Sequence, residues 1–323
     1  MNTTQRVTAN WLQNSGLKGE DLLFEALLRR GFLVFRDSMG IWLGSGSHAL
    51  DIYPLEAIPG LTLKHINGNS ILGDRLAQLF LQDIGQETAM EVAISIIALG
   101  EHHHEATKRS AGATTTGTGY NLAEDWYCYC RMVWGCKLPV CPIYDPDDSD
   151  LMDSDFPPDE YPSQSLKLSP TMPLVRNALD TGIALFVKAL PLARIATKLS
   201  CDGHGKRPSW VSLILSWDVI WAKAVFSYLN VPHPNSSWTW EDNIIVITPP
   251  GRSSDLEAEE SPYTDEEVLG VLNDIQAFSR VLLNQELIDK LGTMRKKFCR
   301  TLNRQRLYSS GFTEEAARNF LEA

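Results

Sequence analysis

The sequence predicts a fold of mixed helices and strands, of the α+β or the α/β class. Apolar residues recur at helical spacing in several segments, and short apolar runs bounded by glycine and polar residues stand between them. Of the 323 residues, 44% are hydrophobic and 21% are charged, which is typical of a globular chain with a substantial core. We expect a small N-terminal sheet with helices, a C-terminal helix-strand-strand-helix-strand unit, and a long C-terminal helix.

The N-terminal part contains a clearly marked helix over residues 19–30. Its first turn is acidic, its last two residues are arginines, and Gly31 follows, which suits the helix dipole and the usual helix end. Three short apolar runs then predict a small sheet. These runs cover residues 32–35, 41–43 and 50–53. Over residues 69–99 the apolar spacing is helical and predicts two helices that are broken near Gly85.

An acidic, proline-rich segment, residues 145–165, separates the two halves of the sequence. It has too little apolar surface to order itself, so we interpret it as a linker or a long surface loop. A calcium loop is the alternative, because alternating aspartates supply oxygen ligands, but the glycine of an EF-hand turn is missing. We therefore divide the chain into residues 1–144, 145–165, 166–250 and 251–323.

Strands and helices alternate within residues 166–250, which predicts a compact unit. The expected elements are a helix (174–190), two strands (194–199 and 210–215), a helix (219–229) and a strand (243–247). The two strands should be neighbours in one sheet, with residues 200–208 connecting them at its edge. The long C-terminal helix should begin after Thr264, because acidic residues occupy the turn that follows it.

Charge and cysteine content restrict the cellular setting. The net charge of −11 should repel nucleic acid and anionic membranes unless a local basic patch overrides it. Six cysteines in a chain of this length are too few for a disulfide framework and predict reduced thiols. No signal-peptide pattern opens the sequence, and its apolar runs are too short to span a membrane. We expect a soluble, cytoplasmic protein without a membrane partner.

The most informative motif is the turn that begins Cys201-Asp202-Gly203-His204. Cys201 is a candidate nucleophile or metal ligand, because the thiolate both attacks and coordinates. His204 is a candidate acid/base or metal ligand, and Asp202 would orient it or add a carboxylate ligand. A hairpin turn in which Asp-Gly supplies the bend and Cys201 is simply packed remains the alternative.

The same turn has features of an anion-binding loop. Gly203 and Gly205 permit backbone conformations that are closed to other residues and let amides approach a ligand. Lys206 and Arg207 follow and add positive charge suited to phosphate or carboxylate. These four residues are therefore candidates for substrate binding.

A second candidate metal site is the run His103-His104-Glu105. Imidazoles suit zinc, and an adjacent acid suits general-base chemistry. The run resembles the His-x-Glu half of the motif of the zinc nucleobase deaminases. The second half of that motif does not match, because Cys136 and Cys141 are separated by four residues rather than two, so we assign no family.

The basic residues between Arg295 and Arg306 form a cluster near the C-terminus. Such a cluster can bind phosphates of nucleic acid, although a solvated helix end that complements the helix dipole has the same composition. Taken together, the motifs favour an enzyme, a hydrolase or transferase, acting on a small anionic or phosphate-bearing, nucleotide-like substrate. The alternative is a regulatory or nucleic-acid-associated binding protein that uses the basic helix, and a protein-binding adaptor is the third possibility.

Overall fold

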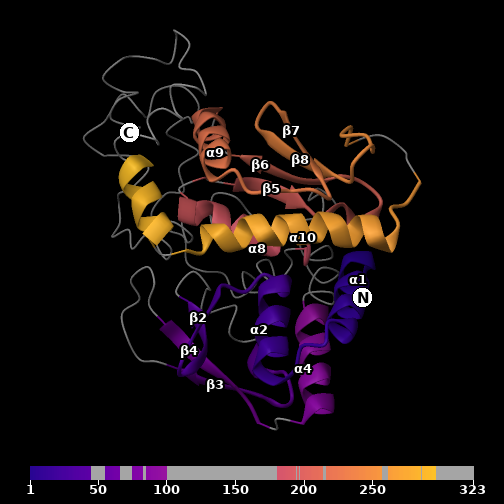
Figure 1. Cartoon of the computed structure of the whole chain (residues 1–323), viewed down its shortest axis with the longest axis vertical. Coiled ribbons are helices and arrows are strands. Elements are labelled where there is room, and N and C mark those ends of the chain that lie inside the picture. The colour runs from indigo at the N-terminus through magenta and orange to yellow at the C-terminus, as the bar shows by residue number, and fades with distance from the viewer. Residues whose placement is uncertain are drawn as a thin grey trace, which may run out of the picture.

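The chain folds into two parts, each built on a four-stranded sheet (Figure 1). The computed structural model describes residues 1–44, 55–65, 75–82, 85–99, 180–193, 195, 197–213, 216–256, 261–284 and 286–295. Every strand pairing in these residues is antiparallel. The fold is therefore α+β, the first of the two predicted classes, and the parallel sheet of an α/β unit is not found in the described residues.

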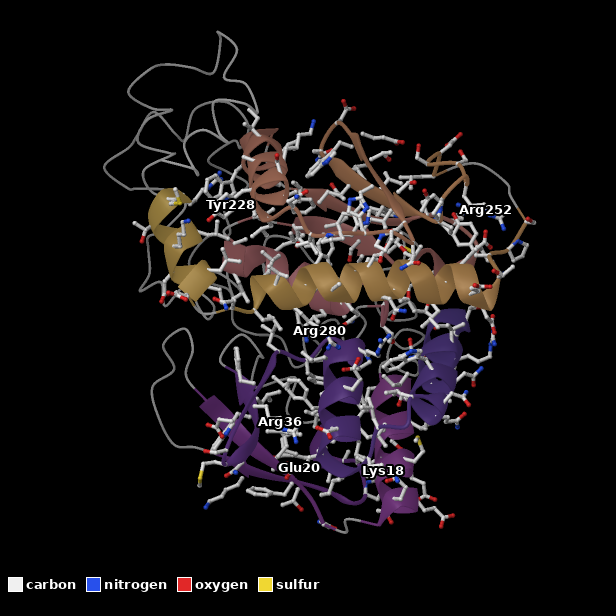
Figure 2. All side chains as sticks on the ribbon, viewed as in Figure 1. Lys18, Glu20, Arg36, Tyr228, Arg252 and Arg280 are labelled. Carbon is white, nitrogen blue, oxygen red and sulfur yellow. The ribbon has the colours of Figure 1, made fainter. Side chains whose placement is uncertain are left out.

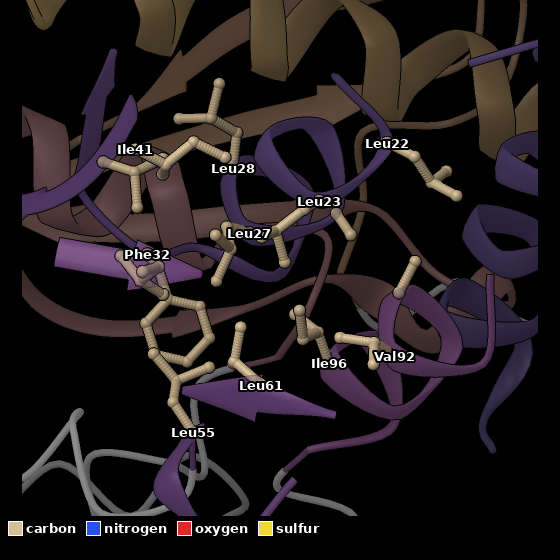
Figure 3. Packing of buried hydrophobic residues seen from close by; sticks show 14 of the residues in the cluster. Leu22, Leu23, Leu27, Leu28, Phe32, Ile41, Leu55, Leu61, Val92 and Ile96 are labelled. Carbon is tan, nitrogen blue, oxygen red and sulfur yellow. The ribbon is translucent and has the colours of Figure 1, made fainter. Parts of the chain in front are cut away.

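The N-terminal part has helices on one face of its sheet. The helices are α1 (Thr3–Asn14), α2 (Gly19–Arg30) and α4 (Gln86–Ala98). The strands are β1 (Val34–Asp37), β2 (Gly40–Gly44), β3 (Leu61–His65) and β4 (Arg75–Leu81), in the order β1-β2-β4-β3. Leucines of α2 pack between this sheet and α4, and the labelled side chains of Figure 3 form that core.

The prediction of two helices over residues 69–99 needs correction. Residues 75–81 form strand β4 rather than a helix, and only α4 of the two expected helices is found there. The apolar residues of β4 fit helical spacing, but Ala77 and Leu79 also alternate to one buried face between β2 and β3. Tertiary pairing thus decided a pattern that the sequence left ambiguous. Helix α1 and strand β3 were not expected.

The C-terminal part contains the second sheet, of order β5-β6-β8-β7. Its strands are β5 (Thr197–Cys201), β6 (Ser209–Leu213), β7 (Ser237–Glu241) and β8 (Ile244–Thr248). Its helices are α8 (Ala184–Ala189), continued by a 3-10 turn over Leu190–Ala193, α9 (Ser216–Leu229) and α10 (Asp265–Leu282). The predicted pairing of the strands on either side of residue 205 is confirmed, with β5 antiparallel to β6.

Helix α10 lies between the two parts (Figure 1). Thr264 caps it, and the side chain of Glu267 returns to the Thr264 amide, so the predicted helix start is confirmed. On the side of the N-terminal part, Arg280 of α10, which is labelled in Figure 2, pairs with Glu25 of α2 at 2.7 Å. The same Glu25 oxygen accepts a hydrogen bond from Arg29, so this buried acid binds one arginine from each part. Residues 286–295 form a further helical segment after α10.

Several expectations lie outside the described residues. These are the strand at 50–53, the acidic linker or calcium loop at 145–165, the helix start before residue 180, and the basic cluster beyond residue 295. Arg295 itself is described, and it is 1% exposed with its guanidinium 5.4 Å from the ring centroid of Trp221. This first residue of the basic cluster is thus a core residue rather than a surface cation.

None of the helices in the described residues combines the length and the apolar character that crossing a bilayer requires.

Candidate metal centre at the turn between strands β5 and β6

The backbone conformation of the turn between β5 and β6 requires glycine at two positions. Gly203, His204 and Gly205 all have positive φ angles, of 72°, 53° and 71°. A Cβ atom at Gly203 would lie 2.8 Å from the carbonyl oxygen of Pro208, and one at Gly205 would lie 2.7 Å from Cγ2 of Thr3. Both predicted glycines are therefore needed for the turn itself, because any larger residue would be strained and would clash. They hold His204 in a left-handed conformation that non-glycine residues adopt only rarely.

The structure adds a fourth residue, Asp180, to the three predicted for the centre. Asp180 stands just before α8, and its Oδ2 atom accepts a hydrogen bond of 3.2 Å from the backbone amide of Asp202. In return, the amide of Gly182 donates to Oδ2 of Asp202 at 3.3 Å. These two bonds hold the start of α8 against the turn. One ligand atom from each of Asp180, Cys201, Asp202 and His204 lies within 4.8 Å of the others.

The imidazole of His204 lies between a thiol and two carboxylates. Its Nε2 atom is 3.5 Å from Sγ of Cys201 and 3.9 Å from Oδ2 of Asp180. Its Nδ1 atom is 3.2 Å from Oδ1 of Asp202. One ring nitrogen therefore faces the thiol and the first carboxylate, while the other faces the second carboxylate. This is the arrangement in which a carboxylate sets the tautomer of a histidine whose opposite nitrogen does the chemistry.

Burial differs strongly across the centre. The side chain of Asp202 is 0% exposed and that of Asp180 is 7% exposed, whereas that of His204 is 45% exposed. Burial and, after it, the neighbouring charge of Asp202 raise the pKa of Asp180 to about 7, against the opposing effect of His204. The centre therefore reaches solvent through its histidine, while its two acids are held in the interior close to each other.

The same surroundings act on the thiol. Burial and, after it, the charges of Asp180 and Asp202 together raise the pKa of Cys201 to about 12. A hydrogen bond of 3.3 Å from the Gly203 amide to Sγ works in the opposite direction but is weaker. At neutral pH the residues of the centre alone therefore keep Cys201 as a thiol, which is neither a strong nucleophile nor a metal ligand. A cation would reverse this, because a coordinated thiol is deprotonated outright.

Lys206 and Arg207 follow the centre directly and are exposed. Their backbone amides both donate to the carbonyl of Gly203, which closes the turn. Within the described part of the chain, neither side chain forms an ion pair. The turn thus presents two cations to solvent next to His204 in the sequence, and their role in binding an anion stays a prediction.

The remaining predicted metal ligands, His103, His104 and Glu105, lie outside the described residues. Sequence reasoning missed Asp180 altogether. It precedes Asp202 by 22 residues, and no spacing rule connects a lone aspartate before an apolar helix with a turn beyond it. Its only local signal is the following Thr181-Gly182 pair, which matches a helix start more readily than a ligand.

Comparison with known proteins found no matching family model, no similar curated protein and no similar solved structure. The function of the chain must therefore be argued from the site itself.

Proposed function

We propose that the protein binds a divalent transition-metal ion, zinc above all, at the centre formed by Asp180, Cys201, Asp202 and His204. The observation that carries this proposal is the convergence of one sulfur, one imidazole nitrogen and carboxylate oxygens within 4.8 Å. Zinc is borderline soft and binds this mixture of donors, whereas magnesium and calcium prefer oxygen alone.

Three of the residues are suited to be ligands and the fourth to hold one of them in place. Both oxygens of Asp202 are already engaged. Oδ1 accepts the His204 amide at 2.9 Å and lies near Nδ1, and Oδ2 accepts the Gly182 amide. We therefore assign Asp180, Cys201 and Nε2 of His204 as ligands and Asp202 as the carboxylate that orients the imidazole.

Electrostatics favour a cation at this place. Two buried carboxylates lie beside a thiol, and burial, followed by the charge of Asp202, raises the pKa of Asp180 to about 7. A divalent ion would replace the proton on Asp180 and the thiol proton, two positive charges for two, so the thiolate and the carboxylate are ionised without adding net charge to the interior. Metal binding therefore explains why two acids are buried here although the burial of a charge costs free energy.

A role in hydrolysis or group transfer on a small anionic substrate is the function that we favour for the bound metal. Three protein ligands are the number usual in catalytic zinc sites, and such sites keep a position for an exchangeable group. The exposure of His204 supports access from solvent, and Lys206 and Arg207 support an anionic substrate. Zinc would supply a Lewis acid for a carbonyl or phosphoryl oxygen.

Metal titration of the full chain tests this proposal. After treatment with a chelator, the protein should bind zinc and cobalt(II) but not magnesium. Cobalt should produce a thiolate-to-metal charge-transfer absorption that Cys201→Ser removes. Histidines and cysteines outside the described residues are competing metal ligands, and the spectrum of Cys201→Ser distinguishes them from the proposed centre. If metal binds with an unchanged thiolate band in Cys201→Ser, the centre lies elsewhere in the chain, and if no metal binds the proposal is wrong.

A second candidate function is a thiol hydrolase in which Cys201 attacks, His204 accepts the proton and Asp202 orients the imidazole. The distances of 3.5 Å from Sγ to Nε2 and 3.2 Å from Nδ1 to Oδ1 favour it. The raised pKa of Cys201 opposes it, because catalytic thiols of this kind have a lowered pKa.

Alkylation kinetics separate the two functions. In the presence of chelator at pH 8, the peptide that contains Cys201 should react with iodoacetamide at least about 100-fold more slowly in the folded chain than in urea, since little thiolate is present. The rate should keep rising with pH beyond pH 10 because the pKa of Cys201 is about 12. A folded-state rate above that in urea, with a plateau below pH 7, would instead establish the thiol hydrolase.

A further inference from the structure

We propose that the first turn of α1 is a brace for the metal centre, in which Thr3 and Thr4 act as positioning residues. Docking of α1 and metal binding are then coupled, each strengthening the other. This inference rests on the proposed metal-binding function and adds to it the part of the chain that controls its affinity.

The contacts of the brace fall on the two segments that carry the ligands. The Cγ2 atom of Thr3 lies 2.7 Å from the position that a Cβ atom would take at Gly205, the residue after His204. The Cγ2 atom of Thr4 lies 2.9 Å from the corresponding position at Gly182, two residues after Asp180. Two adjacent methyl groups of α1 therefore pack on backbone next to two of the three ligands. The glycines leave just enough room for this approach.

The start of α10 also holds the turn. The amide of Tyr263 donates to the carbonyl of Gly205 at 2.9 Å. Arg6 of α1 forms two hydrogen bonds of 2.6 Å to Asp265 at the start of α10. The first turn of α1, the metal-binding turn and the start of α10 are thus one connected contact. Movement of α1 cannot leave the position of His204 unchanged.

Two buried hydroxyls near the contact between α1 and the turn lack hydrogen bonds. These are the hydroxyls of Thr4 and Thr181, which have no hydrogen-bond partner within the described part of the chain. Buried hydroxyls without partners lower the stability of the contact that buries them. A metal ion that joins Asp180 to the turn restrains this weakened contact and thereby favours the docked position of α1.

Reciprocity follows from thermodynamic linkage. If docked α1 holds the ligands in the geometry that the metal requires, then bound metal must favour docked α1 by the same factor. The coupling therefore has two independent measurements, one of metal affinity and one of the protection of α1.

Serine variants of the full chain test the brace. Thr3→Ser combined with Thr4→Ser removes only the two methyl groups, while Asn2 and Gln5 still form the capping box. The matched control is Thr8→Ser, the same chemical change on a buried residue of the next turn. We expect the double variant to bind zinc about tenfold more weakly, as is usual for residues that support ligands, and the control to bind like the wild type. The visible spectrum of bound cobalt should change in the double variant alone.

Hydrogen exchange supplies the second measurement. On addition of zinc to the wild-type chain, amide exchange in α1 should slow about tenfold, while exchange in β2 and β4, which are remote in the N-terminal sheet, should not change. Wild-type affinity in the double variant together with unchanged exchange in α1 would overturn the brace but leave the metal centre intact. Absence of zinc binding in the wild type would overturn the metal centre and the brace together.

Discussion

Replacing His204 with alanine or Cys201 with serine should each lower zinc affinity by more than about 100-fold. Loss of an outer carboxylate alone costs about 10- to 100-fold, so loss of a direct ligand must cost more. Asp202→Asn should fall within that smaller range and keep binding one metal ion, because it changes the orientation of His204 rather than the number of ligands. Isothermal titration with a competing chelator measures all three affinities.

The control for these variants is Cys299→Ser, which removes a thiol that belongs to none of the assigned groups. Fold and binding must be measured separately, by circular dichroism and by titration. At zinc concentrations 100 times the wild-type dissociation constant, the wild type should gain about 2.7 kcal/mol of stability, and the His204 variant should gain less than about 0.4 kcal/mol. If His204→Ala folds and retains full affinity for zinc, the turn is only structural, as the alternative interpretation of its sequence holds.

Replacing Gly31 with alanine should cause the largest loss of stability among the single substitutions considered. Gly31 ends α2 with a φ of 102°, and a Cβ atom there would lie 2.3 Å from Cβ of Ala184 and 3.0 Å from the backbone nitrogen of Leu185. The left-handed conformation costs about 1–2 kcal/mol for alanine, and overpacking adds about 1–3 kcal/mol. The contact joins α2 to α8, so the clash falls where the two parts meet.

Gly16→Ala is the matched control for this substitution. Gly16 also has a positive φ, of 75°, but no atom lies within 4 Å of the position of its Cβ. Its loss should be limited to the conformational cost of about 1–2 kcal/mol. Urea unfolding of both variants measures the difference. Equal losses would mean that the contact between α2 and α8 relaxes without cost and does not fix how the two parts pack.

The accuracy of the predicted elements depended on how local their signals are. Helix α2 was predicted with its observed bounds and α10 with its observed start, because acids in the first turn, an N-terminal cap, and cations or glycine at the end are short-range features. The end of α10 at Leu282 was not predicted. Strand β4 was mistaken for a helix because its burial pattern is created by pairing with β2 and β3. Helix α1 was missed although Asn2 and Gln5 form a capping box at its start, so a local signal for it was present in the sequence.

By itself, the sequence determined the chemistry of the turn. Cys201, Asp202 and His204 are so close along the chain that two strands and a Gly-x-Gly turn suffice to bring their side chains together. Tertiary structure alone decided the rest. Asp180 joins the centre because α8 packs beside the turn, and burial of the thiol together with the charges of Asp180 and Asp202 raises the pKa of Cys201 to about 12. Desolvation depends on what surrounds a group in space, so residue order could identify the thiol but could not distinguish a nucleophile from a metal ligand.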